Sequence, residues 1–260
     1  MNWPDGLKLT DLEEAKTRIV DFISDYVRTA KAKGVVMGLS GGIDSALVCS
    51  LAVEALGPER VLVEFLPVRA EDDAKNLADA RNLADRLGVE AELFELEPVI
   101  KAFEPLGLDR VSRGNLAARM RMAVCYARAN QRGMLVIGTG NKTEILTGYF
   151  TKYGDGGVDL LPIANLYKVN VQQLSEYMGI PRAIIEKPPS AGLWEGQTDE
   201  GELGVLYDEI DKMLYLRFER GVDWNGLEEM GFDKAKVDRV RSLYLRSQHK
   251  REPLPRPESR

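Results

Sequence analysis

The sequence predicts an α/β protein: a parallel sheet flanked by helices on both faces, with further helices toward the C-terminus. Short apolar, β-branched runs alternate with helical patterns through the first half of the 260 residues, as in sheets with parallel pairing. Glycine-containing loops follow two of these runs. With 44% hydrophobic residues, the chain can bury one large core, or one core with a smaller appendage. We therefore expect one domain over residues 1–260.

Each expected element has a recognisable pattern. Thr10 or Asp11 can cap a first amphipathic helix that is expected to end at Gly34. Strands are expected at 35–38, 60–67, 89–96 and 133–138, the third too irregular in alternation to be taken as an edge strand. Helices are expected at 46–52, 71–87, 115–132, 169–178, 202–217 and 234–245.

The stretch 35–52 is the most informative part of the sequence. Apolar residues, then small residues at 38–42, then apolar residues at helical spacing predict a strand, a tight loop and a helix. The start of that helix would present unpaired N–H groups and a positive dipole end to an anion. Gly41 and Gly42 let the backbone approach phosphate oxygens. Asp44 would repel phosphate unless a cation lies between them, which suggests Mg²⁺.

Two other interpretations of the loop compete with this one. The sequence contains neither G-x-x-x-x-G-K-[ST] nor G-x-G-x-x-G, the phosphate loops of other nucleotide-binding proteins. A plain glycine turn, with Asp44 or Ser45 as the helix cap, would explain a lone glycine pair. Residues 40–45 instead match S-G-G-x-D-S, and here the chain resembles the ATP pyrophosphatase superfamily, whose members cleave ATP between the α- and β-phosphates. The resemblance implies that the loop holds the departing pyrophosphate.

A second loop, 138–144, leaves the fourth expected strand and enters a helix. Ligands bind beyond the carboxyl ends of parallel strands, so we expect this loop beside 40–45. Glu144 falls in the first helical turn, where a carboxylate can cap backbone N–H groups or bind a metal ion. In the second case Asp44 and Glu144 are the two protein carboxylates that Mg²⁺ typically takes.

Segment 147–165 is glycine-rich, polar and long, which indicates a functional or mobile loop. Lys152 lies in it and Lys168 follows it closely. Each lysine has an ordinary surface explanation, but an acidic protein that binds a polyanion needs cations nearby. Asp155 and Asp159 have an alternative role in turns, hydrogen-bonding their own backbone.

Charge and composition exclude several classes of function. A net charge of −6 and a pI near 5.2 argue against a broad nucleic-acid or membrane surface. Cys49 and Cys125 are expected to be buried, reduced thiols. The lone His249 leaves no Ser–His–Asp or zinc pattern. The N-terminal residues form no apolar targeting segment, so a cytoplasmic location is expected by default.

Arginines are concentrated on or next to the helix expected at 115–132. Most of them have an ordinary explanation as a solvated helix face. They are Arg113, Arg119, Arg121 and Arg128.

Taken together, the motifs resemble ammonia-dependent NAD synthetases over nearly the whole chain. Six ordered blocks carry the resemblance: GLSGGIDS, ARMRM, GTGNKTE, GYFTKYGDGGVDLLP, PPSAGLWEGQTDE and the terminal HKR. The first block specifies only the superfamily, whereas the fourth and fifth are far more specific. The resemblance implies an adenine nucleotide alpha hydrolase-like, Rossmann-like fold and ATP-dependent amidation of deamido-NAD⁺ through an adenylated nicotinate carboxylate.

Site residues carried over by motif fall into three groups. ATP would be held by Gly38, Leu39, Ser40, Gly41, Gly42, Ile43, Asp44, Ser45, Thr139, Lys168 and Ser190, with Asp44 and Glu144 on Mg²⁺. The dinucleotide would contact Arg119, Lys152, Asp159, His249 and Lys250. Ammonia must lose a proton after attack, and Asp155 is the carboxylate expected to accept it.

The resemblance also implies a homodimer with the dinucleotide near the subunit interface. Longer relatives carry an N-terminal glutaminase domain, which we do not expect here, so ammonia is free or comes from a separate glutaminase. Two rivals remain: another amidating or tRNA-modifying ligase of the superfamily, and a regulatory nucleotide-binding module without chemistry. The first more often has a basic surface or paired reactive cysteines. The second has little use for Glu144 or for the loop around Lys152.

Overall fold

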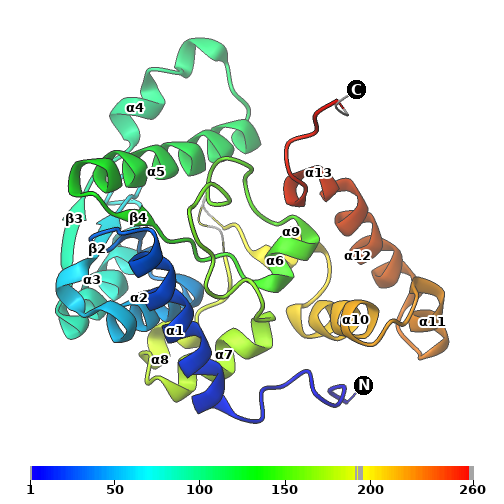
Figure 1. The fold of residues 1–260 in the computed structure, drawn as a ribbon. Helices are drawn as coiled ribbons and strands as arrows, with labels where there is room; N and C mark the ends of the chain where they lie inside the picture. Colours follow the sequence, from blue (N-terminus) through cyan, green and yellow to red (C-terminus); the bar gives the residue numbers. More distant parts are fainter. Residues whose placement is uncertain (1, 191, 193–195, 258–260) are drawn as a thin grey trace.

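The computed structural model describes residues 2–190, 192 and 196–257. Its centre is a parallel sheet in the order β3-β2-β1-β4 (Figure 1). The strands are β1 (Val35–Gly38), β2 (Val61–Phe65), β3 (Glu90–Leu93) and β4 (Leu135–Val136). This architecture confirms the α/β fold with parallel pairing.

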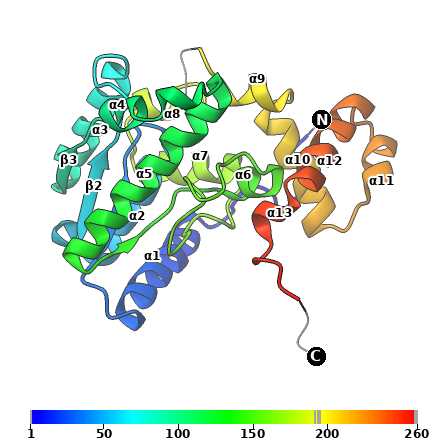
Figure 2. The same ribbon diagram turned by 90° about the horizontal axis from the view of Figure 1, so that it is seen from above.

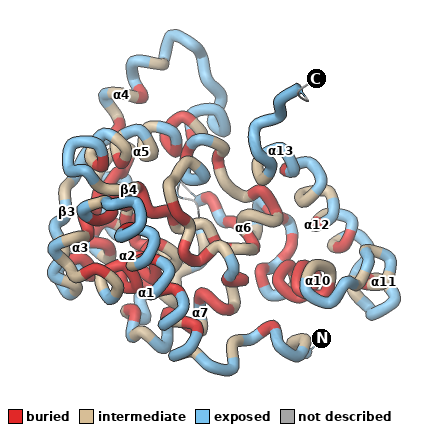
Figure 3. The backbone as a smooth tube through the Cα atoms, in the orientation of Figure 1, coloured by how far each residue is buried: buried red, intermediate tan, exposed pale blue. Residues whose placement is uncertain are grey.

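Alternation along the strands divides the core into two faces. Val35 and Met37 of β1 pack in the main cluster with α1 (Leu12–Thr29), α2 (Ile43–Leu56) and α3 (Ala74–Leu87). Val36 points the other way, toward α5 (Arg110–Arg132). Burying both faces stabilises a parallel sheet, and the central strands β1 and β2 are buried along their whole length apart from Gly38. In Figure 3 the buried stretches gather in the central strands and in α2.

Helices after residue 200 form a separate layer. Figures 1 and 2 place α10–α13 at the end of the molecule opposite β3. This layer has its own apolar cluster, which includes Ile210, Met213 and Leu227. Between it and the sheet lie α6 and α7. The remaining helices are α4 (Glu97–Lys101), α6 (Lys142–Thr147), α7 (Lys168–Tyr177), α8 (Arg182–Ile185), α9 (Asp199–Leu203), α10 (Tyr207–Glu219), α11 (Trp224–Glu229), α12 (Lys234–Arg246) and α13 (Gln248–Arg251).

Several expected boundaries change. The first helix is capped by Asp11, as expected, but ends at Thr29 rather than at Gly34. β3 pairs only with β2, so it is an edge strand, and its exposed positions explain the poor alternation. The helix expected at 202–217 is in fact two helices, because Gly204 adopts φ +76° and ends α9.

The expectation for the two cysteines is confirmed. Cys49 and Cys125 are free and buried, and burial raises the pKa of each thiol to about 12. Within the described residues, no helix has the length and apolar character needed to cross a bilayer.

Candidate active site

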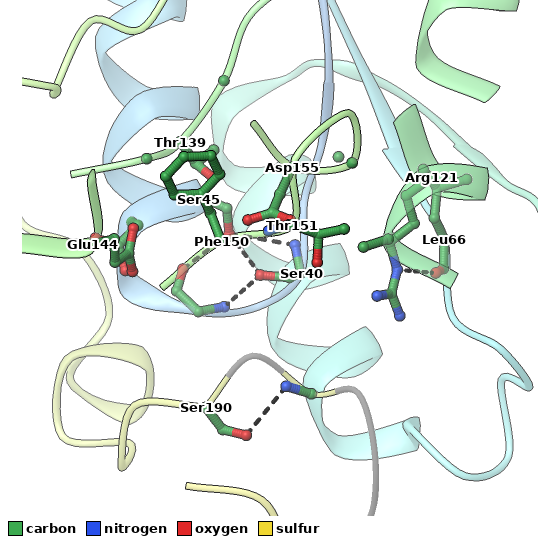
Figure 4. Close-up of a pocket in the computed structure, with 18 of the residues that line it drawn as sticks. Ser40, Ser45, Leu66, Arg121, Thr139, Glu144, Phe150, Thr151, Asp155 and Ser190 are labelled. Carbon is green, nitrogen blue, oxygen red and sulfur yellow. Dashed lines mark hydrogen bonds between the residues drawn. The ribbon is translucent and has the colours of Figure 1, made fainter. Parts of the chain in front are cut away.

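The loop between β1 and α2 has the shape of an anion cradle. Gly41 adopts φ +76°, and a Cβ atom there would lie 2.4 Å from the carbonyl oxygen of Asn76, so only glycine fits. Gly42 is the N-cap of α2, and no side chain caps it. The interpretation of Asp44 or Ser45 as the helix cap is therefore wrong. Ser45 Oγ donates instead to the Gly42 carbonyl (3.0 Å) and lies 3.1 Å from Ser40 Oγ (Figure 4).

Two carboxylates and one lysine meet beside this loop. Lys168 Nζ lies 2.6 Å from Asp44 Oδ2 and 3.9 Å from Glu144 Oε1. Asn141 joins the same group, because its Nδ2 donates to Asp44 Oδ1 at 2.9 Å. The two acidic residues, 100 positions apart in the chain (144 − 44), are thus brought together at the carboxyl edge of the sheet, where the sequence predicted them.

Glu144 serves the helix as well as the cluster. Its Oε2 accepts from the Asn141 backbone N–H (3.1 Å), while Asn141 Oδ1 accepts from the Glu144 N–H (3.0 Å), which forms a capping box on α6. Its Oε1 faces Lys168. Of the two interpretations of Glu144, the cap is present, and it leaves one oxygen for a cation.

Burial sets the electrostatics of this cluster. Burial and, next, the neighbouring Asp44 carboxylate raise the pKa of Glu144 well above its usual range. Burial alone would lower the pKa of Lys168, but Asp44 and Glu144 outweigh it and raise that pKa. The lysine therefore stays charged between two acids that repel each other.

A cavity of about 570 Å³ opens over the loop. Figure 4 shows Glu144 on one side of the serine pair and Arg121 on the other. The wall includes nearly all residues expected to hold ATP. They are Gly38, Leu39, Ser40, Gly42, Ile43, Asp44, Ser45, Thr139, Lys168 and Ser190, with Gly41 behind the wall. In the block 188–200, Ala191 and residues 193–195 lie outside the described residues.

The glycine-rich loop places its two aspartates differently. Asp155 lines the cavity and accepts from the Thr151 N–H at 2.9 Å. Burial of the carboxyl group raises the pKa of Asp155, although the residue as a whole is exposed. Asp159 lies outside the wall and accepts from the Val136 N–H (2.7 Å) and the Tyr126 hydroxyl (3.0 Å), so it joins the loop to β4 and α5.

The residues expected to hold the dinucleotide do not converge in the cavity. Of the five, only Lys250 lines it, and its Nζ donates to the Gly148 carbonyl at 2.7 Å. Lys152 Nζ donates to the His249 carbonyl at 2.6 Å, and His249 and Arg119 are exposed. These contacts join the glycine-rich loop to α13.

Some residues of the site were not singled out in the sequence. Asp199 is buried and accepts from the Tyr207 hydroxyl (3.0 Å), and its Oδ1 has no hydrogen bond from any residue that the structure describes. Asn141 had a recognisable signal, since Asn followed three positions later by Glu is a capping pattern. Two of the four arginines singled out in the sequence turn inward: Arg121 lines the cavity and donates to the Leu66 carbonyl (3.0 Å), and Arg128 pairs with Glu64 (3.0 Å).

The donor set limits what the site can hold. In the part of the chain that the structure describes, no three His, Cys, Asp or Glu side chains converge as a metal site. Asp44 and Glu144 could supply two oxygen ligands, which suits an ion that takes its other ligands from phosphate and water.

Comparisons with known proteins agree with this geometry. A sequence model of the family described as NAD synthase matches residues 15–254. The NH(3)-dependent NAD(+) synthetase of Methanosarcina mazei is 49% identical over 254 residues, which is 95% of this chain and 99% of that protein. Among solved structures, NMN synthetase from Francisella tularensis (TM-score 0.84, 38% identity) and NH3-dependent NAD synthetase from Campylobacter jejuni (TM-score 0.83, 31% identity) are similar over 96% of this chain and 100% of theirs. The chain therefore belongs to the NAD synthase family.

Proposed function

We propose that this protein is a ligase of NAD biosynthesis that amidates deamido-NAD⁺ with ammonia, consumes ATP, and releases AMP and pyrophosphate. One observation carries the proposal: the Asp44–Lys168–Glu144 cluster lies beside a glycine cradle within a cavity, in a chain of the NAD synthase family. The cradle suits the pyrophosphate portion of ATP, and the cluster suits the metal that accompanies it.

The first step needs alignment and charge neutralisation. The nicotinate carboxylate is ionised at neutral pH, so no general base is required. One of its oxygens attacks the α-phosphorus, and pyrophosphate leaves with the electron pair of the broken P–O bond. Lys168 remains protonated beside Asp44 and can neutralise charge on the phosphates. Holding the reactants together is worth about 7–11 kcal/mol of barrier.

Mg²⁺ is proposed as the metal of this site. Asp44 and the free oxygen of Glu144 would hold it, with phosphate oxygens and water as the other ligands. The fit rests on the acid pair: burial and, next, the Asp44 carboxylate raise the pKa of Glu144, and a bound cation would stabilise both carboxylates in their charged form. When bound, the ion would neutralise charge on the departing pyrophosphate.

The second step forms the amide. Ammonia attacks the carbonyl carbon of the adenylate, AMP leaves, and the nitrogen gives up one proton. Asp155 is proposed to take it, because its carboxylate faces the cavity and has a raised pKa. Asp155→Asn is then expected to slow NAD⁺ formation by about 100-fold, within the usual range for a lost general base, and to leave adenylation nearly unchanged. Equal loss of both steps, measured by rapid quench, would contradict this role.

The dinucleotide is proposed to lie across the cavity mouth and the exposed residues next to it. Arg119, Lys152, Asp159, His249 and Lys250 would contact it or orient the loop that does. Because all but Lys250 lie outside the cavity wall, we propose that a second copy of the chain completes the site, in a homodimer. We also propose one domain over residues 1–260, cytoplasmic, supplied with free ammonia or ammonia from a separate glutaminase.

A second candidate substrate is nicotinate mononucleotide. It is favoured by the 38% identity and TM-score of 0.84 to a protein named NMN synthetase. The same cradle, cluster and Asp155 would serve either acceptor, since only the distal nucleotide differs.

Exchange of labelled pyrophosphate into ATP separates the candidates. The purified protein, with Mg²⁺, is tested with deamido-NAD⁺, nicotinate mononucleotide, xanthosine monophosphate and tRNA in turn. Exchange with deamido-NAD⁺ that stops when EDTA removes Mg²⁺ is the expected result. Exchange only with the mononucleotide favours the second candidate, exchange only with xanthosine monophosphate or tRNA favours another ligase of the superfamily, and no exchange would rule out adenylation.

A further inference from the structure

Lys187 lies beside the glycine cradle and also lines the cavity. Its side chain is 17% exposed, and its Nζ has three oxygen neighbours: the Gly41 carbonyl (2.9 Å), Asn76 Oδ1 (2.7 Å) and Asp79 Oδ2 (2.7 Å). An ammonium group has three protons, and three acceptors surround this one. Lys187 is therefore not free to bind phosphate, unlike Lys168, which lies between the acids of the cluster.

The contact with Gly41 fixes a peptide plane. In a trans peptide the C=O and the following N–H point in opposite directions. Holding the Gly41 carbonyl toward Lys187 therefore turns the Gly42 N–H to the other side of the loop, where Gly42 lines the cavity. Among the described residues, the acceptor of that N–H is Ser40 Oγ in its own loop, at a long distance of 3.3 Å. A backbone N–H directed this way is what a phosphate-binding loop needs.

Without the hydrogen bond from Lys187, little fixes the orientation of the Gly41–Gly42 peptide plane. Gly41 has φ +76°, and glycine passes between conformations more readily than any other residue. Asn76 lies against the glycine and accepts from Lys187, while Asp79 balances the charge of the ammonium. The three partners come from the cradle and from α3, so one side chain ties the cradle to its neighbouring helix.

We propose that Lys187 is a positioning residue that orients the Gly41–Gly42 peptide for binding the pyrophosphate portion of ATP. The assignment rests on the proposed function for the identity of the nucleotide. Lys187 acts through the backbone of the loop and does not touch the reacting atoms. Removing its ammonium should therefore weaken phosphate binding without affecting the dinucleotide.

The test compares Lys187→Met with a matched control, Lys16→Met. Lys16 is 18% exposed and pairs with Glu13 and Glu54 across α1 and α2, away from the cavity. Calorimetric titration with pyrophosphate and Mg²⁺ is expected to show about 10- to 100-fold weaker binding in Lys187→Met, as for loss of a hydrogen bond from a charged donor. Lys16→Met should bind like the wild type.

Kinetics provide the second readout. In Lys187→Met the KM for ATP should rise by a similar factor, while the KM for deamido-NAD⁺ stays within about twofold. Lys187→Arg keeps the charge and should recover part of the affinity, because a planar guanidinium cannot meet all three acceptors as an ammonium does. If Lys187→Met does not fold, pyrophosphate binding and the KM values are measured on Lys187→Arg instead.

Three outcomes would overturn the assignment. They are unchanged pyrophosphate binding in Lys187→Met (or, where Lys187→Met does not fold, in Lys187→Arg), an equal loss in Lys16→Met, or an equal rise in both KM values. Failure of the proposed function looks different: the wild type would bind pyrophosphate, and Lys187→Met would bind it poorly, yet no nicotinate substrate would support exchange.

Discussion

Two acid–cation clusters border the same cavity, and they differ in what surrounds them. In the first, Lys168 lies between Asp44 and Glu144, with side chains 11–17% exposed. In the second, Arg128 lies 3.0 Å from Glu64 and also pairs with Glu92. The side chain of Glu64 is 0% exposed, and neither of its oxygens has a hydrogen bond among the described residues. The first cluster is open to a ligand and the second is sealed.

The two clusters contain similar charged groups, but their different surroundings indicate different roles. Every carboxylate of the first cluster has a polar partner and still faces the cavity. Burial raises the pKa of Glu64 to about 7, even though Arg128 acts to lower it. A sealed pair of this kind contributes little net stability but is costly to break. We therefore expect changes in the first cluster to affect catalysis and changes in the second to affect folding.

The largest effect is expected from Lys168→Met. Removing the charge leaves two buried acids beside the phosphates, so kcat/KM should fall by about 10³-fold. The free energy of unfolding should fall by less than for the sealed pair, because Asp44 and Glu144 are partly exposed at the cavity and Asp44 keeps its hydrogen bond from Asn141. Steady-state amidation and urea unfolding measure the two quantities. If the loss of stability were large enough to explain the loss of activity, the Lys168 cluster would have a structural role like that of the Arg128–Glu64 pair, and the proposed difference between them would be wrong.

Arg128→Met should show the opposite pattern. It leaves Glu64 buried without a counter-ion, which costs about 3–5 kcal/mol of unfolding free energy at pH 8. The kcat of the remaining folded protein should stay within about twofold, because Arg128 does not line the cavity. The double variant Arg128→Met, Glu64→Gln should recover part of the stability. A fall in kcat with unchanged stability would place this pair in the active site instead.

The sequence was sufficient for the parts of the fold and site that depend on local pattern. The apolar runs of β1 and β2, the small residues at 40–42 and the carboxylates that follow two strands all have local signatures. Parallel topology then brings the carboxyl ends of the strands together. That is why Asp44 and Glu144 could be placed at one site before the structure was known.

The remaining contacts depend on packing between distant segments, which no local pattern encodes. Lys187 reaches α3, 111 residues earlier in the chain, and Arg128 reaches the buried Glu64 across the sheet. Helical spacing left open which arginines of α5 are solvated, and Arg121 and Arg128 in fact contact Leu66 and Glu64, in or next to β2. The position of β3 at the edge of the sheet was not predicted for a related reason. Most of its residues are exposed, so its sequence lacks the alternation of apolar and polar residues on which the prediction relied.

The smallest expected effect is a dependence of stability on pH that Glu64 introduces. Its folded pKa, about 7, is raised from 4.5, so the folded state binds the proton more tightly than the unfolded chain. The stability from this proton is fully present below about pH 4.5 and is lost as pH rises through about 7. Arg128, Glu92 and Arg132 are the charged groups that face it.

Between pH 6 and pH 8 the wild type should therefore lose about 1 kcal/mol relative to Glu64→Gln, which has no proton to lose. Urea unfolding of both proteins at the two pH values measures this difference. A constant difference would mean that Glu64 does not titrate in this range. Glu64 would then keep one protonation state across this range, and the second cluster would differ from the Lys168 cluster in its exposure to solvent and not in its titration.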